Sequence, residues 1–147
     1  MKSAPQFSVE LLSPLGRLCR TRPWMSSLLL TSLFGGLTAL AAQVSLRLPF
    51  TPIPVTGQVF MVLLAGGLLG ARRGAVSQMQ YLALGAMGLP VFAGGVNGLV
   101  AFSSPSAGYL FGFVAAAWIV GLLTGKSRSW GRILGANLVG VAVIYLF

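Results

Sequence analysis

The polar side chains that could bind a ligand in this chain are neutral amides and hydroxyls. They concentrate near residues 56–58, 81 and 97–109, among aromatic side chains. Amides and hydroxyls both donate and accept hydrogen bonds, so such a set suits an uncharged polar ring with an apolar body. Each residue alone is better explained as a cap or an interfacial residue, and only their convergence on one face favours a site. The set is Thr56, Gln58, Tyr81, Phe92, Asn97, Phe102, Ser103, Ser104, Ser106 and Tyr109.

Histidine and acidic side chains are nearly absent. The chain has no histidine, and its one acidic residue, Glu10, lies in a basic N-terminal stretch. Acid/base catalysis, metal binding and proton-driven pumping all require such groups. The sequence therefore predicts no catalytic residue, no metal, no cofactor, and neither an enzyme nor an ion-driven pump. Residues 121–127, GLLTGKS, have three residues between the glycines where a phosphate-binding loop needs four. If the protein moves a solute against a gradient, the energy must therefore come from another chain.

The uncharged stretch 89–109, LPVFAGGVNGLVAFSSPSAGY, separates two long apolar runs. Its glycines, with Pro90 and Pro105, argue against one continuous helix. We expect a loop on the outer side of a membrane, with a lid over a small neutral ligand as the functional alternative.

Composition predicts an all-α membrane protein. Hydrophobic residues make up 56% of the chain and charged residues 7%, whereas about 25% charged residues is usual in soluble domains. The basic residues occur in short clusters between apolar runs, which argues against nucleic-acid binding. Three prolines in residues 49–54 predict an extended connector. The predicted helices are residues 23–46, 56–71, 75–88, 106–123 and 133–147, the last too short to span a bilayer.

The distribution of Lys and Arg predicts the orientation. Nine of the 10 basic residues lie in every second connection between the predicted helices, so they share one side of the membrane. Only Arg47 lies in a connection on the other side. By the positive-inside rule, residues 1–22 form a basic cytoplasmic tail and residues 23–147 a membrane domain, with 47–57 and 89–105 outside. Small residues spaced four apart predict close helix contacts. These pairs are Gly35 with Ala39, Gly66 with Gly70, Gly108 with Gly112, and Gly131 with Gly135.

Three motifs carry a resemblance to a known family. PFTPIPVTGQVFMVLLAGGLLGARRGA, YLALGAMGLPVFAGG and SPSAGYLFGFVAAAWIVGLL resemble, in order and spacing, the biotin-transporter S components (BioY) of energy-coupling-factor (ECF) transporters. The resemblance runs from about residue 28 to 147. It implies a six-helix membrane bundle that captures biotin from outside and docks on a transmembrane T component with two ATPases.

The resemblance also implies site residues. The biotin contacts map onto Thr56, Gln58, Tyr81, Phe92, Asn97 and Tyr109, and the contact with the T component onto Gly35, Ala39 and Ala42. The family's sixth helix carries an Asp and, three residues later, a Lys that help hold biotin, and the sequence ends before such a segment. We therefore expect five of six spanning segments in a domain that is incomplete at its C-terminus. A truncated, non-binding or accessory structural membrane protein is the alternative.

Overall fold

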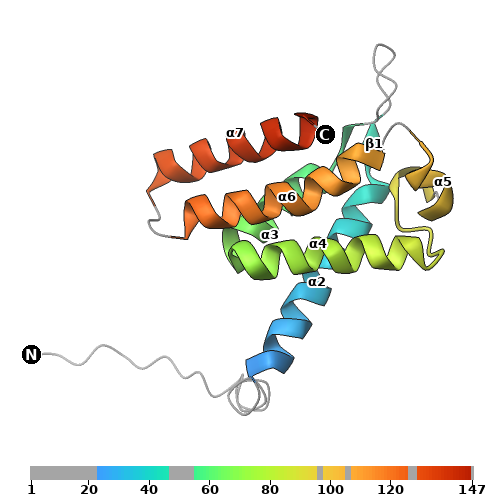
Figure 1. Ribbon diagram of the computed structural model, residues 1–147, viewed down its shortest axis with the longest axis horizontal. Helices are drawn as coiled ribbons and strands as arrows, with labels where there is room; N and C mark the ends of the chain where they lie inside the picture. The colour runs from blue at the N-terminus through green and yellow to red at the C-terminus, as the bar shows by residue number, and fades with distance from the viewer. Residues whose placement is uncertain (1–22, 47–54, 96–97, 105–106, 126–128, 147) are drawn as a thin grey trace, which may run out of the picture.

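The computed structural model describes residues 23–46, 55–95, 98–104, 107–125 and 129–146. In that part of the chain five long helices form a bundle, and a small strand pair and two short helices lie at one end of it (Figure 1). The elements in order are α2 (Pro23–Gln43), β1 (Ser45–Leu46), β2 (Val55–Thr56), α3 (Gln58–Leu69), α4 (Ala71–Ala86), η2 (Ala93–Gly95), α5 (Gly98–Phe102), α6 (Ala107–Thr124) and α7 (Trp130–Leu146). The predicted tail at residues 1–22 lies outside the described residues.

The all-α fold is confirmed, and each predicted helix corresponds to one long helix. Several boundary predictions were wrong. The first helix ends at Gln43, and Ser45–Leu46 form β1 instead. Arg72 and Arg73 were expected in the connection after the second helix, but they lie in the first turn of α4. The turn is made earlier by Gly70, whose φ of 81° is a backbone conformation that favours glycine. Both arginine side chains are exposed at this end of the bundle.

The prediction of a plain loop over residues 89–105 was also wrong, because this segment contains η2 and α5. Gly88 follows α4 with a φ of 94°, and Gly94 and Gly95 have φ values of 76° and 71°, which favour glycine. Helix α5 then places Ala101 in the core, with 5% of its surface exposed. A helix of five residues is too short to show a periodic pattern in sequence.

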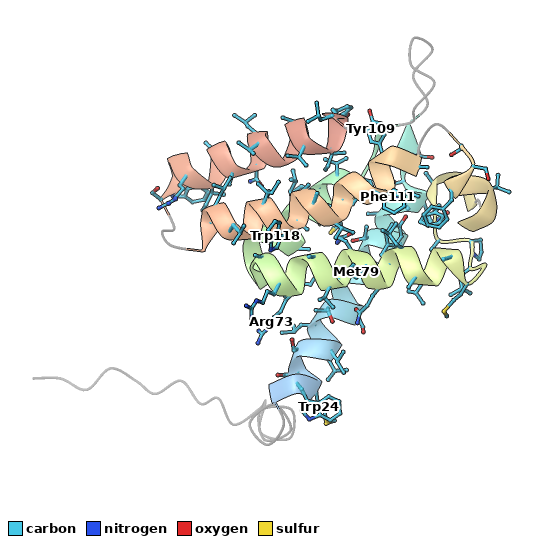
Figure 2. All side chains as sticks on the ribbon, in the orientation of Figure 1. Trp24, Arg73, Met79, Tyr109, Phe111 and Trp118 are labelled. Atoms are coloured by element: carbon cyan, nitrogen blue, oxygen red, sulfur yellow. The ribbon has the colours of Figure 1, made fainter. Side chains whose placement is uncertain are left out.

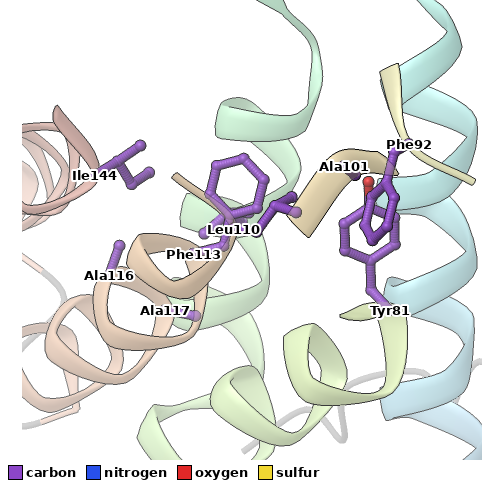
Figure 3. Packing of buried hydrophobic residues seen from close by; sticks show 9 residues of the cluster. Tyr81, Phe92, Ala101, Leu110, Phe113, Ala116, Ala117 and Ile144 are labelled. Carbon is purple, nitrogen blue, oxygen red and sulfur yellow. The ribbon is translucent and has the colours of Figure 1, made fainter. Parts of the chain in front are cut away.

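Helix α6 is central to the bundle, since it packs against α3, α4 and α7. Small residues permit the close crossings: a Cβ on Gly66 of α3 would lie 2.5 Å from the carbonyl oxygen of Ala117 in α6. A close helix contact was predicted at both Gly66 and Gly70. It occurs at Gly66, whereas Gly70 forms the turn between α3 and α4. The buried cluster shown in Figure 3 joins α3, α4, α6 and α7 to the 92–101 segment.

The outer surface of the bundle is strongly apolar. Leu40 is 68% exposed, Phe111 56% and Trp118 50%, and such side chains are solvated favourably by lipid. Two helical segments, Trp24–Gln43 and Ala107–Thr124, are long and apolar enough to cross a membrane, whereas α3 and α7 are shorter apolar helices.

Candidate functional site

A chain of hydrogen bonds connects the start of α3 to α4 and to the segment that follows α4. Thr56 Oγ1 donates to Gln58 Oε1 at 2.7 Å, and Gln58 Nε2 donates to Tyr81 Oη at 2.5 Å. Tyr81 Oη in turn donates to the backbone oxygen of Val91 at 3.2 Å. Gln58 is 5% exposed and Tyr81 is fully buried. The structure thus joins three of the predicted site residues in one buried network.

The strand pair and Gly57 position the first two members of this network. Ser45 of β1 pairs with Thr56 of β2, and the Gly57 amide donates to the Val44 carbonyl at 3.2 Å. A Cβ on Gly57 would lie 3.2 Å from the carbonyl oxygen of Ala41, so glycine permits this close approach to α2. Gly57 therefore lies against α2, and Gln58 begins α3 pointing into the bundle.

Two aromatic rings extend from Tyr81 of α4. Phe92 is 3% exposed, and its ring meets Tyr81 edge to face at a centroid distance of 5.3 Å. Phe102 meets Phe92 in the same manner at 5.9 Å. Figure 3 shows the rings of Tyr81 and Phe92 beside Ala101. This arrangement places apolar ring surface next to a neutral hydrogen-bonding group.

Tyr109 does not join this network. Its ring packs edge to face on Tyr145 of α7, with centroids 5.4 Å apart, and Figure 2 shows Tyr109 at the start of α6, beside the C-terminal end of α7. Asn97 and Ser106 lie outside the described residues. Ser104 Oγ donates to the Ala101 carbonyl at 2.7 Å, which is the capping role that the sequence left open as the simpler explanation.

The small residues predicted to meet a partner face the interior of this chain. A Cβ on Gly35 would lie 3.1 Å from the Ser77 carbonyl oxygen of α4. Ala42 is fully buried, and Ala39 packs against the buried cluster. The exposed face of α2 instead carries Leu29, Leu33 and Leu40, with open space beside Gly36.

A second buried polar cluster, between α2 and α4, was missed by the sequence reasoning. Gln78 Nε2 donates to Thr38 Oγ1 and to Ser77 Oγ, each at 3.3 Å, and both hydroxyls donate to helix carbonyls. Gln78 is fully buried, and its Oε1 has no hydrogen-bond partner. An uncharged glutamine inside an apolar run was the available signal, since such groups commonly link helices in membranes.

An open apolar groove lies between α4 and α6. Its volume is about 660 Å³. Figure 2 shows Met79 on α4 and Phe111 and Trp118 on α6, with Arg73 near the start of α4. None of the predicted site residues lines it; its walls are Ala75, Met79, Leu82, Phe111, Val114, Ala115 and Trp118.

Comparisons with known proteins agree with this architecture. The family model for the BioY family matches residues 11–147. The chain is 39% identical over 121 residues to a biotin transporter BioY of Thermotoga maritima, covering 82% of this chain and 70% of that protein. It is 43% identical over 117 residues to a probable biotin transporter BioY of Pyrococcus horikoshii, covering 80% of this chain and 68% of that protein.

A solved structure shares the fold. The crystal structure of the S-component for biotin from an ECF-type ABC transporter superposes with a TM-score of 0.76 at 28% sequence identity, covering 83% of this chain and 68% of that chain. Fold and site together define a helical membrane protein with a buried, neutral hydrogen-bonding network. The chain belongs to the BioY family.

Proposed function

We propose that this protein captures biotin at the outer face of the cytoplasmic membrane as the S component of an ECF transporter. The observation that carries the proposal is the match in fold, at a TM-score of 0.76, to a biotin S-component over 83% of the chain. The Gln58–Tyr81 contact and the ring of Phe92 supply the neutral hydrogen bonds and apolar surface that a fused ureido and thioether ring system requires.

Binding of radiolabelled biotin to the purified chain in lipid nanodiscs tests this proposal. We expect saturable binding that unlabelled biotin displaces and that thiamine and riboflavin do not. Gln58→Leu should weaken it by roughly tenfold, because one hydrogen bond to the ligand is lost. Absence of saturable binding would favour the alternative of an accessory or non-binding membrane protein.

Transport also needs partners, which we propose to be a transmembrane T component and ATPase subunits. Among the described residues no Asp, Glu, Lys, Arg or His side chain is buried inside the bundle, and such groups are the ones with which carriers couple uptake to an ion gradient. We propose the exposed face of α2, with Leu29, Leu33 and Leu40 around Gly36, as the surface that meets the T component. Coexpression with such a module should make biotin uptake ATP-dependent, and uptake that proceeds without the module would contradict this assignment.

A further inference from the structure

We propose that the apolar groove between α4 and α6 binds one acyl chain of an anionic phospholipid, whose phosphate is held by Arg72. The inference goes beyond biotin capture and does not depend on it. It assigns a lipid site to a surface that none of the candidate biotin residues lines.

Arg72 and the α4 wall of the groove lie on one face of the helix. That wall consists of Ala75, Met79 and Leu82. Arg72 precedes Ala75 by three residues, and spacings of three and four residues put side chains on the same helix face. Helical side chains tilt toward the N-terminal end of their helix, so the exposed Arg72 extends from the groove toward the membrane surface. A phospholipid has the same order, with its charge at the surface and its chain below.

The wall contributed by α6 runs in the opposite direction. A Cβ on Gly121, near the end of α6, would overlap the backbone of Ala71, so the end of α6 packs on the start of α4. Trp118 therefore lies at the end of the groove nearest the arginines and Phe111 at the other end, as Figure 2 shows. Tryptophan is favoured at the boundary between headgroups and acyl chains. The groove thus begins at the charged end of the bundle and continues into the apolar part of the membrane.

The length and the rims of the groove favour a single lipid chain over a partner helix. Ala75 and Leu82 are separated by about 10 Å along the helix axis, which is less than the roughly 15 Å of hydrocarbon in one leaflet. A spanning helix would cross both leaflets, and helix contacts in membranes favour small residues that permit close approach. The exposed rims of the groove are instead the large side chains Met79, Phe111 and Trp118. Such rims suit a thin, flexible chain lying between them.

The positive charge at this end of the bundle calls for an anion from outside the chain. Glu10 is the one acidic residue against 10 basic residues, so carboxylate side chains can neutralise at most one of them. An arginine binds phosphate oxygens through two parallel N–H bonds. Zwitterionic phospholipids carry an ammonium group that offsets the phosphate charge. Arg72 should therefore favour a lipid with net negative charge.

Quenching of tryptophan fluorescence by brominated acyl chains tests the site, because bromine quenches the rings that it contacts. Trp24→Phe and Trp130→Phe leave Trp118 as the single tryptophan. In nanodiscs of mixed phosphatidylcholine and phosphatidylglycerol, with bromine on one lipid at a time, we expect phosphatidylglycerol to be preferred at Trp118 by roughly fivefold. Arg72→Gln should reduce this preference to about twofold or less. Arg73→Gln is the matched control and should retain it, since it removes the same charge from a different face of α4.

Two further variants separate the groove from lipid contact in general. Leu138→Trp in a Trp118→Phe background places the probe at an exposed position of α7, outside the groove, where the preference should be about twofold or less. Ala115→Phe fills the groove from the side of α6 and should lower the preference at Trp118, although both arginines remain.

A preference that survives Arg72→Gln, or that falls equally in Arg73→Gln, would show general attraction to a basic surface and overturn the site. Equal preference at Leu138→Trp, or an unchanged preference in Ala115→Phe, would overturn the assignment of the groove. Should Ala115→Phe fail to fold, the pair of arginine variants decides. Loss of Trp118 quenching by both lipids on adding a T component, or on raising the ratio of protein to lipid, would assign the groove to a partner helix or to a second copy instead.

Discussion

At the scale of single residues, Gly85 of α4 makes room for the ring of Phe92. A Cβ at this position would overlap the Cζ and Cε2 atoms of the ring. Gly85→Ala should therefore lower the free energy of unfolding by about 1–3 kcal/mol, because the ring must leave a well-packed position. Unfolding by SDS in mixed micelles measures this change.

Gly36→Ala is the matched control, since nothing lies within 4 Å of a Cβ there, and its effect should stay within about 0.5 kcal/mol. Adding Phe92→Val to Gly85→Ala should cost less than the sum of the two single substitutions, because the smaller side chain relieves the overlap. If the two substitutions lower the free energy of unfolding additively, the Phe92 ring moves away freely and the predicted overlap with a Cβ at position 85 is contradicted.

The Gln78 cluster leads to a second prediction for single residues. Gln78→Met removes a buried Oε1 that has no partner, while the Thr38 and Ser77 hydroxyls keep their donations to helix carbonyls. We expect it to cost less than about 1 kcal/mol. Thr38→Val should cost more, about 1–3 kcal/mol, because it leaves an amide N–H of Gln78 unpaired as well. The reverse ranking in the same micelle assay would disprove this account of the cluster.

At the scale of elements, the two faces of α2 differ in what they touch. Gly35→Leu places a side chain against the α4 backbone, where even a Cβ would lie 3.1 Å from the Ser77 oxygen. It should lower the free energy of unfolding by about 1–3 kcal/mol or more. Gly36→Leu faces open space and should leave the isolated protein intact, yet hinder assembly with a T component, since bulk at a close helix contact separates helices.

Copurification of the T component with each variant measures assembly, and unfolding in micelles measures the fold. Intact assembly in Gly36→Leu would show that this face of α2 meets lipid only.

At the scale of the whole molecule, the charge distribution predicts orientation. Of the 10 basic residues, all except Arg47 belong to one side, so the start of α4 and the start of α7 should face the cytoplasm. In a Cys19→Ser background, Met87→Cys should react with a membrane-impermeant maleimide from outside, and Ser129→Cys only after permeabilisation. Both positions are exposed. The opposite labelling pattern would refute the orientation.

Several properties of this protein could be predicted from the sequence because they depend on local composition. Apolar runs interrupted by basic clusters and by Gly- and Pro-containing stretches predicted the number and order of the long helices, since a bilayer requires each spanning segment to satisfy its own backbone. Thr56, Gln58, Tyr81 and Phe92 could be selected as candidate site residues because neutral polar and aromatic groups stand out in an apolar chain, and their role in binding stays a prediction. The boundary at Gly70 was missed because a turn made by one glycine leaves little signal in composition.

The tertiary structure decided which of these side chains meet. Tyr109 was selected on the same grounds as Tyr81, yet it packs on Tyr145, because the rotation of α6 directs it toward α7. Gly35 and Gly36 are adjacent in sequence, but α2 packs on α4 so that one is enclosed and the other is open. In an apolar helix every face is equally suited to lipid or protein, so hydrophobic periodicity does not specify its rotation. Steric fit between small residues and hydrogen bonds such as Gln58 to Tyr81 specify it, and these exist only when the helices are packed.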